Sequence, residues 1–201
     1  MTRIAVVDHG AGNLVSVTNA LTEVGADVHL ATNAAGLEGA DGVVLPGVGH
    51  TGAAMRNLLA EGLVDPLKEL DVPLLGICVG LQLFFEGSDE DEEPCLGIMD
   101  GRVQRLTDAP TLPHMGWNAV AFDDEPLFTG LPDGTPFYFV HSYAPNPHDE
   151  DAVVATTTHG DRFCVAARRG PVVGTQFHPE RSGSAGLQVL SNWLDEVGRA
   201  A

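Results

Sequence analysis

Short apolar runs alternate with helix-like segments in the first half of the chain. Residues 4–7 form one such run, and apolar residues then recur at helical spacing over residues 13–24, before Gly25. Further apolar runs lie at residues 28–30, 42–45 and 74–77, with a helical stretch at 53–70. Because uninterrupted apolar runs are typical of strands buried on both faces, the pattern predicts a parallel sheet covered by helices on both sides.

The pattern changes after about residue 100, where β-rich segments are separated by Pro, Gly and Asp. These segments cover residues 102–106, 117–122, 137–143, 153–158, 164–167 and 172–177, and a closing helix is predicted at 185–197. We expect the later strands to be mixed or antiparallel and attached to the same sheet. The predicted fold class is α/β: an open, mostly parallel, twisted sheet with helices on both faces and additional antiparallel strands in the second half.

The composition favours one globular domain spanning residues 1–201. Hydrophobic residues make up 44% of the 201 residues, too many for a disordered chain. The 28 acidic and 10 basic side chains give a net charge of −18, and Lys68 is the only lysine. This scarcity of bases argues against nucleic-acid binding. The acidity suggests adaptation to high salt, with codon bias as the alternative.

No segment resembles a membrane span or a signal peptide, because no apolar run approaches about 18–20 residues. We therefore expect a cytoplasmic protein without membrane association. Cys78, Cys95 and Cys164 lack the spacing of a disulfide framework or a zinc site, so we expect free thiols. No metal or other cofactor is implied.

Cys78 stands between a predicted buried strand and a predicted helix, with Gly76 and Gly80 two positions to either side. This spacing is typical of a nucleophile elbow, a sharp turn whose strained central residue needs small neighbours. A helix N-terminus also favours a thiolate and a developing oxyanion. For the segment alone, the less favoured alternative is a buried structural cysteine at a tight turn.

A second candidate segment follows the apolar run at residues 172–176. If the chain is extended there, His178 and Glu180 point to the same side, so the carboxylate can orient the imidazole. His178 alone is more typical of a structural histidine, but with Cys78 it predicts a Cys-His-Glu triad that attacks a carbonyl through a thiolate. His114 and His141 also lie in segments distinctive enough for pocket contact.

Two loops complete the candidate chemistry. Residues 45–49 (LPGVG) follow a predicted strand, and glycines there allow backbone N–H groups to approach an oxyanion, although most Pro-Gly pairs are only turns. The acidic run at residues 88–93 is expected to be mainly a solvated loop.

The motifs GICVGLQ at residues 76–82 and GTQFHPE at 174–180 resemble those of class I, triad-type glutamine amidotransferases. The resemblance spans nearly the whole chain. PGVG at 46–49, PHMGWN at 113–118 and YFVHSY at 138–143 are also similar to the glutaminase subunits of imidazole glycerol phosphate synthases, which act in histidine biosynthesis.

The resemblance implies a role for each matching residue. Cys78 is the expected nucleophile, His178 the general base and acid, and Glu180 the orienting carboxylate. The positions expected to bind glutamine are Gly47, Gly49, Gln82, Glu90, His141, Ser142 and Tyr143. Trp117, Asn118 and Arg181 are expected at a partner interface, with Arg181 replacing the lysine usual in the family.

The implied reaction is hydrolysis of L-glutamine to glutamate and ammonia. In the family, ammonia passes to a (βα)8-barrel cyclase, which converts N'-phosphoribulosyl formimino-AICAR-phosphate to imidazole glycerol phosphate and AICAR. A barrel of roughly 250 residues does not fit within this chain, so the cyclase is expected as a separate subunit of a heterodimer.

Other functions are possible on the same motifs. The alternatives are the glutaminase subunit of another class I enzyme, such as pyridoxal phosphate synthase, and a cysteine peptidase or γ-glutamyl hydrolase. These remain open because a catalytic triad alone does not determine which amide bond is cleaved. A non-catalytic binding protein is harder to reconcile with Cys78, His178 and Glu180 all being present.

Overall fold

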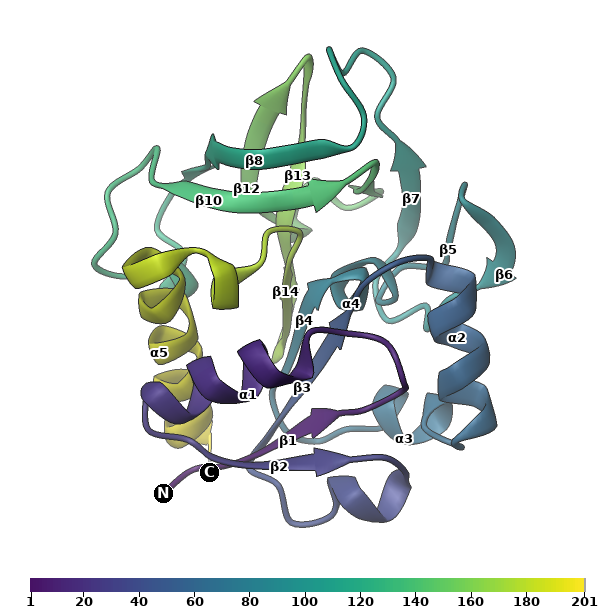
Figure 1. Ribbon diagram of the computed structural model, residues 1–201, viewed down its shortest axis with the longest axis vertical. Helices are drawn as coiled ribbons and strands as arrows, with labels where there is room; N and C mark the ends of the chain where they lie inside the picture. The colour runs from purple at the N-terminus through teal and green to yellow at the C-terminus, as the bar shows by residue number, and fades with distance from the viewer. Residues whose placement is uncertain (201) are drawn as a thin grey trace.

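A computed structural model describes residues 1–200 and contains a central eight-stranded sheet in the order β2-β1-β3-β4-β14-β13-β12-β9 (Figure 1). Its strands are β1 (Arg3–Val7), β2 (Asp27–Ala31), β3 (Gly42–Gly47), β4 (Leu74–Cys78), β9 (Ala121–Phe122), β12 (Val153–His159), β13 (Asp161–Arg169) and β14 (Val172–Thr175). The helices are α1 (Leu14–Glu23), α2 (Thr51–Ala60), α3 (Val64–Lys68), α4 (Val79–Gln82) and α5 (Gly183–Ala200). Short 3-10 helices are η1 (Ala34–Leu37), η2 (Pro126–Phe128), η3 (Glu150–Ala152) and η4 (Pro179–Arg181).

Five neighbouring strands of the main sheet, β2, β1, β3, β4 and β14, run parallel. Every residue of β3 and β4 is buried, which explains why their sequences are apolar without alternation. Beyond β14 the pairing becomes antiparallel, through β13, β12 and β9. The predicted fold class, a mostly parallel sheet extended by antiparallel strands from the second half, is confirmed.

Helices cover both faces of the sheet, as two glycines of β3 demonstrate. A Cβ atom on Gly42 would lie 3.0 Å from Val197 of α5, whereas one on Gly47 would lie 2.8 Å from Val79 of α4. Positions five residues apart on a strand face opposite sides, so α4 and α5 pack against opposite faces. In Figure 1, α1 lies beside α5 and α2 lies on the other side of the molecule.

Two smaller sheets lie outside the main sheet, which corrects the expectation that all later strands attach to it. One pairs β8 (His114–Ala119) with β10 (Pro136–His141), and the other joins β11 (Tyr143–Pro147), β7 (Gly101–Arg105), β5 (Gly87–Ser88) and β6 (Asp91–Pro94). Phe137 and Phe139 of β10 contact Phe177 ring to ring. These aromatic contacts pack β10 against the segment that follows β14, without extending an edge of the main sheet.

Turn residues divide several predicted elements. The helix expected over residues 53–70 forms α2 and α3, because Gly62 adopts a positive φ of 65° between them. The strand expected at 137–143 divides into β10 and β11 at Ser142, and that expected at 117–122 divides into β8 and β9 at Val120. Among the described helices, none combines the length and the apolar character needed to cross a membrane.

Parallel order brings the carboxyl ends of β3, β4 and β14 to one edge of the sheet. Gly47 is paired with Cys78, and Thr175 is paired with Ile77 in the neighbouring ladder. Ligands of open α/β sheets bind at such edges, because the loops that follow the strands converge there. The candidate residues of the elbow, the glycine segment and the His178 segment lie at or just after the ends of these three strands.

Candidate active site

Cys78 forms a strained turn between β4 and α4. Its backbone has φ 56° and ψ −108°, and it is the only non-glycine residue with a positive φ in the part of the chain that the structure describes. Such a conformation costs about 1–3 kcal/mol and persists only where the surroundings enforce it. Gly76 and Gly80 permit the turn, because a Cβ on Gly76 would lie 2.6 Å from the Phe84 ring and one on Gly80 would overlap the Leu45 carbonyl oxygen.

His178 and Glu180 meet in a buried hydrogen bond of 2.8 Å between Nδ1 and Oε1. The expectation of an extended segment is correct for His178, which has φ −97° and ψ 97°, but not for Glu180, which lies in η4. The turn therefore brings the carboxylate back to the imidazole. Ser182 fixes this turn by donating from Oγ to the His178 carbonyl, at 2.7 Å.

The electrostatic environment of His178 favours the imidazolium. Burial by itself lowers the pKa of His178, but hydrogen bonding and charge attraction from Cys78 and Glu180 outweigh it and raise the pKa to about 10. Since Nδ1 donates to Glu180, Nε2 is the ring nitrogen available to the thiol. Nε2 is buried and has no hydrogen-bond partner of ordinary geometry among the described residues, although Cys78 is near enough to raise the pKa.

A cavity of about 620 Å³ opens in front of Cys78 and His178. Six of the seven expected glutamine-binding residues line it, namely Gly49, Gln82, Glu90, His141, Ser142 and Tyr143. Gly47 does not line the cavity, because it packs beneath it against Val79. Lining residues that the sequence did not predict include Val48, His50 and Arg105.

A chain of side-chain amides leads from the cavity wall to the candidate nucleophile. The Gln82 amide nitrogen donates to the Tyr143 carbonyl and to Oε1 of Gln176, at 3.0 Å in both cases. The Gln176 amide nitrogen then lies 3.6 Å from Sγ of Cys78. Gln176 was not predicted as a site residue, although a polar residue at the end of the apolar run at 172–176 was a usable signal.

His141 forms an uncharged part of the cavity wall and is hydrogen-bonded to His114, which does not line the cavity. His141 donates from Nδ1 to the Tyr143 carbonyl, so its Nε2 accepts from Nδ1 of His114, and Nε2 of His114 in turn accepts from the Asn118 amide. Burial lowers the pKa of His141 to about 3, and burial together with the charge of His159 lowers that of His114 to about 4. Both rings are therefore neutral near pH 7.

A hydrogen bond and a positive φ shape the glycine segment at the end of β3. His9 donates from Nε2 to the Pro46 carbonyl at 2.8 Å, a contact that the sequence did not predict. Gly49 adopts a φ of 86°, and the Val48 side chain between the glycines is 40% exposed. The segment thus turns sharply beside the cavity before α2 begins.

The acidic run at residues 88–93 is more than a solvated loop. It forms the β5–β6 turn, and its carboxylates cap the N-terminus of α2: Glu90 accepts from the Thr51 backbone at 3.2 Å and Asp91 from the Gly52 backbone at 2.8 Å. Glu90 also lies 3.0 Å from Nδ1 of His50. His50, Glu90 and Asp91 are the one group of three metal-type ligands found among residues 1–200, and these contacts already engage them.

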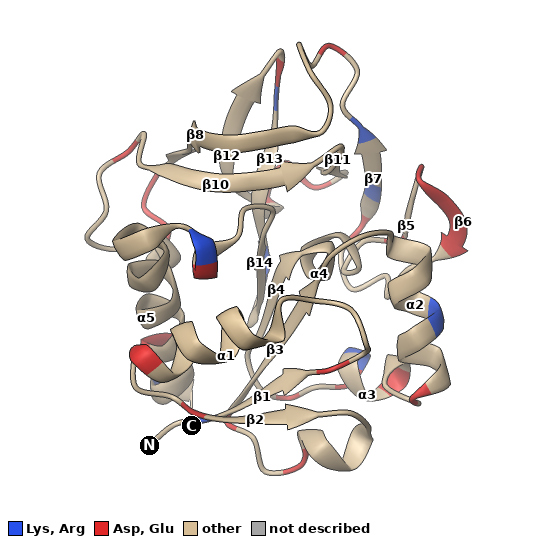
Figure 2. Cartoon of the chain, viewed as in Figure 1, with Lys and Arg blue, Asp and Glu red and all other residues tan. Residues whose placement is uncertain are grey.

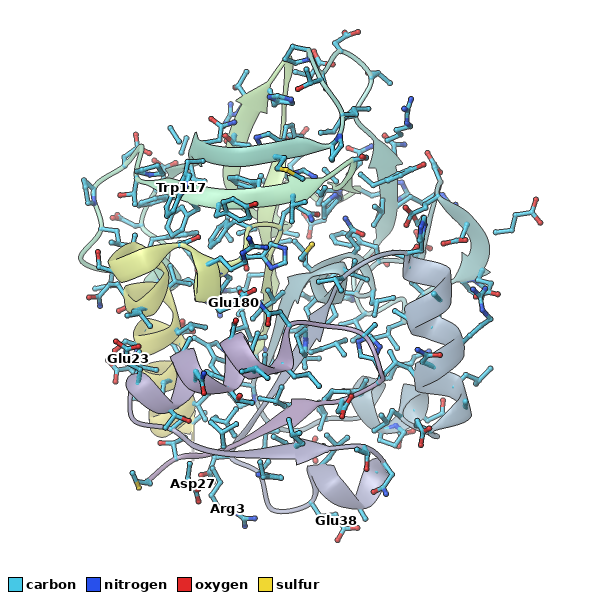
Figure 3. The ribbon with its side chains drawn as sticks, in the orientation of Figure 1. Arg3, Glu23, Asp27, Glu38, Trp117 and Glu180 are labelled. Carbon is cyan, nitrogen blue, oxygen red and sulfur yellow. The ribbon has the colours of Figure 1, made fainter. Side chains whose placement is uncertain are left out.

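Of the three residues expected at a partner interface, Trp117 and Arg181 meet at the Tyr138 ring, whereas the Asn118 side chain points to the other side of β8. Trp117 on β8 is 57% exposed, and its ring meets that of Tyr138 edge to face. Arg181 lies 4.4 Å above the Tyr138 ring. Asn118 is anchored by its bonds to His114 and the Thr158 carbonyl. Figure 3 shows Trp117 on the outer β8–β10 layer and Glu180 in the interior below it.

Comparisons with known proteins agree on one family. The family model of glutamine amidotransferase class-I matches residues 5–197. Curated proteins named imidazole glycerol phosphate synthase subunit HisH are similar over nearly their full length: that of Synechococcus sp. is 49% identical, covering 98% of this chain and 95% of the relative, and that of Xylella fastidiosa strain Temecula1 is 48% identical, covering 97% and 98%.

The fold also matches solved structures of low sequence identity. A crystal structure described as a putative GMP synthase subunit from Thermoplasma acidophilum superposes with a TM-score of 0.77 at 23% identity, covering 99% of this chain and 95% of the other. A structure described as a glutamine amidotransferase superposes with a TM-score of 0.76 at 21% identity, covering 96% and 98%. These similarities support the fold alone.

Proposed function

The chain belongs to the class I glutamine amidotransferase family, and we propose that it is the glutaminase subunit of an imidazole glycerol phosphate synthase, acting in histidine biosynthesis. One observation carries the chemistry. Cys78, on a strained strand-to-helix turn, shares a cavity with His178, whose Nδ1 is bonded to Glu180. This arrangement supplies a nucleophile, a proton carrier and an orienting carboxylate, which acyl transfer from an amide requires.

The first half of the reaction forms a thioester. The Cys78 thiolate attacks the side-chain carboxamide carbon of glutamine, a carbon–sulfur bond forms, and the tetrahedral intermediate carries negative charge on oxygen. His178 gives its Nε2 proton to the departing nitrogen as the carbon–nitrogen bond breaks, and ammonia leaves. The raised pKa of His178, to about 10, favours the charged imidazolium, which is the proton donor that this step needs.

The second half consumes water. Neutral His178 takes a proton from a water molecule that attacks the thioester carbon, and the carbon–sulfur bond breaks to regenerate the thiolate beside the imidazolium. The product leaves as the γ-carboxylic acid and loses its carboxyl proton to water, giving glutamate. Glu180 keeps Nδ1 protonated throughout, so Nε2 alone exchanges protons.

Residues around the cavity bind glutamine in this proposal. Gln82, Ser142 and Tyr143 contact the substrate, and the uncharged His141 contributes to the wall. Glu90 attracts the α-ammonium group from the cavity rim, where its side chain is 13% exposed. Backbone N–H groups near Gly47 and Gly49 stabilise the oxyanion.

The partner in this proposal is a separate cyclase subunit with a (βα)8-barrel fold, and the two chains form a heterodimer. The exposed Trp117 supplies apolar area and Arg181 supplies charge beside it, and Asn118 contributes from the neighbouring position on β8. Ammonia passes across this interface to the cyclase. The glycine segment at residues 46–49 becomes competent when the cyclase binds its own ligand.

A glutaminase assay with and without the cyclase and its ligand tests the proposal. We expect slow hydrolysis by this chain alone and a large increase when both are added. Cys78→Ala abolishes glutamine-dependent synthesis, whereas free ammonia restores synthesis in the same variant. Cys164→Ala is the matched control, because Cys164 is a buried thiol that does not line the cavity, and it leaves both reactions intact.

Other outcomes identify the alternatives. Glutamine-dependent synthesis that survives Cys78→Ala contradicts the proposal. Hydrolysis of γ-glutamyl peptides without any partner points to a peptidase or γ-glutamyl hydrolase. Activation by a pyridoxal phosphate synthase partner, and none by the cyclase, assigns the chain to that enzyme.

A further inference from the structure

Gln176 is a buried amide that contacts the sulfur of the candidate nucleophile. We propose that Gln176 is a further catalytic residue, whose side-chain N–H donates a hydrogen bond to Sγ of Cys78 and stabilises the thiolate. The inference deepens the proposed glutaminase function and rests on it, because it assigns a role within the same site.

The position of Gln176 is set by the sheet. It follows β14, next to β4 at whose end Cys78 lies, and it is completely buried. Its backbone N–H donates to the Val165 carbonyl at 2.7 Å. Its amide nitrogen then lies 3.6 Å from Sγ, a hydrogen-bond distance for the larger sulfur atom.

The direction of the Gln176 amide follows from its neighbours. A backbone carbonyl only accepts, so the Gln82 group that faces the Tyr143 carbonyl is its NH₂. The second N–H of that group reaches Gln176, which must present Oε1 to it. The nitrogen of Gln176 therefore faces Cys78, and the donor role at sulfur does not depend on an arbitrary choice of amide orientation.

A neutral donor at sulfur complements His178. The imidazolium stabilises the thiolate only while it holds the Nε2 proton, and it gives that proton away when ammonia departs. Gln176 keeps its N–H throughout the cycle, so it stabilises sulfur before attack and again when the thioester breaks and the thiolate leaves. Burial strengthens the bond, because no water competes for the sulfur at that side.

The test follows the pH dependence of Cys78 alkylation by iodoacetamide, with the labelled peptides separated by mass spectrometry. The other thiols react slowly, because burial raises the pKa of Cys95 to about 11 and of Cys164 to about 12. Gln176→Met removes the donor at similar volume, and Gln176→Glu replaces it with a carboxylate. Gln176→Asn keeps the amide but is shorter by one methylene, which moves the amide away from Sγ of Cys78. This variant replaces either of the other two if that one fails to fold.

We expect the pH midpoint of Cys78 labelling to rise by about one to two units in Gln176→Met, the size expected for one hydrogen bond to a charged group. The midpoint rises further in Gln176→Glu and also rises in Gln176→Asn. Glutamine turnover at neutral pH falls by about tenfold or more in Gln176→Met, because fewer molecules carry the thiolate.

Asn192→Asp is the matched control. Asn192 is also a buried amide, but it donates to the Leu127 and Thr129 carbonyls, away from the cavity. The Asn192→Asp variant is expected to lower Tm without moving the pH midpoint of Cys78 labelling. An unchanged midpoint in the folded Gln176 variants, or an equal shift in Asn192→Asp, overturns the inference. Failure of the proposed function is a separate result: the wild-type chain then hydrolyses no glutamine with its cyclase, whatever the Gln176 variants show.

Discussion

Contacts with Cys78 and Glu180 together set the charge of His178, the general base. Burial opposes a charged imidazole, yet Cys78 and Glu180 raise the pKa of His178 to about 10. Because this value lies above the 6.5 of an unfolded histidine, the interaction stabilises the folded state fully below about pH 6.5. That stabilisation declines as the pH rises and is lost through about pH 10.

Glu180→Gln tests this electrostatic role. The amide still accepts a hydrogen bond from Nδ1 but carries no charge, so we expect the pKa of His178 to fall below about 10. Glutamine hydrolysis should decrease by about 10²–10⁴-fold, the usual contribution of a positioned acid or base. NMR titration of the His178 ring protons measures the first effect, and a glutaminase assay with the cyclase present measures the second.

Glu23→Gln is the control for Glu180→Gln. Glu23 is an exposed carboxylate at the end of α1, and it makes no hydrogen bond or ion pair with His178 or Glu180. It should change neither the titration nor the activity. A His178 that still titrates near pH 10 in Glu180→Gln means that Glu180 does not supply the charge stabilisation assigned to it.

At the scale of elements, the strand-to-helix elbow depends on close contact between α4 and β3. Gly80→Ala places a methyl group on the Leu45 carbonyl oxygen, so α4 must move away from the sheet. We expect a loss of about 1–3 kcal/mol or more in the free energy of unfolding, and loss of glutaminase activity as Cys78 shifts with the helix. Urea unfolding and the coupled assay measure these two effects.

Gly198→Ala provides the matched comparison for Gly80→Ala. Gly198 lies in α5, and the nearest atom that a new Cβ would meet is Oγ1 of Thr2 at 4.0 Å. Replacing a helical glycine by alanine in open space stabilises by up to about 1 kcal/mol. A similar small gain in Gly80→Ala would contradict the close packing assigned to the elbow.

The elements most accurately predicted from the sequence are those whose pattern is decided locally. The runs that became β1, β3 and β4 are apolar because both faces of each strand are buried, and the glycines around Cys78 report a backbone constraint. The pairing of β8 with β10 in a separate sheet was not predictable, because strand pairing depends on contacts distant in sequence.

The site residues that were not predicted from the sequence also depend on contacts between positions distant in sequence. Gln176 acquires its role by contacting Cys78 and Gln82, which lie on another strand and helix. His9 does so through the Pro46 carbonyl. In contrast, His178 and Glu180 are two positions apart, so their meeting was predictable even though η4, and not an extended strand, brings them together.

At the scale of the whole molecule, the net charge of −18 is spread mainly outside the catalytic centre. Acidic residues lie in the β5–β6 turn and in several loops, and basic residues are few (Figure 2). Glu180 is buried in the site and Glu90 lies at its rim, but Asp123 and Asp124 are exposed and make no ion pair with any described residue. The acidity therefore concerns chiefly how the surface interacts with solvent and ions.

Mutual repulsion among these carboxylates makes stability depend on salt. The Debye length falls from about 10 Å at 0.1 M to about 3 Å at 1 M, so molar KCl screens repulsion between neighbouring surface acids. We expect Tm to rise from 0.1 to 1 M KCl, by about 2–4 °C for each kcal/mol of repulsion removed.

The double variant Asp123→Asn/Asp124→Asn, which removes two exposed charges, should melt higher at 0.1 M KCl and gain less from added salt. Sucrose at matched osmolality distinguishes screening from general exclusion of solute, because it should stabilise both proteins equally. A Tm and glutaminase activity that are highest at low ionic strength and fall towards molar KCl would rule out adaptation to high salt, while leaving the proposed function of Cys78, His178 and Glu180 intact.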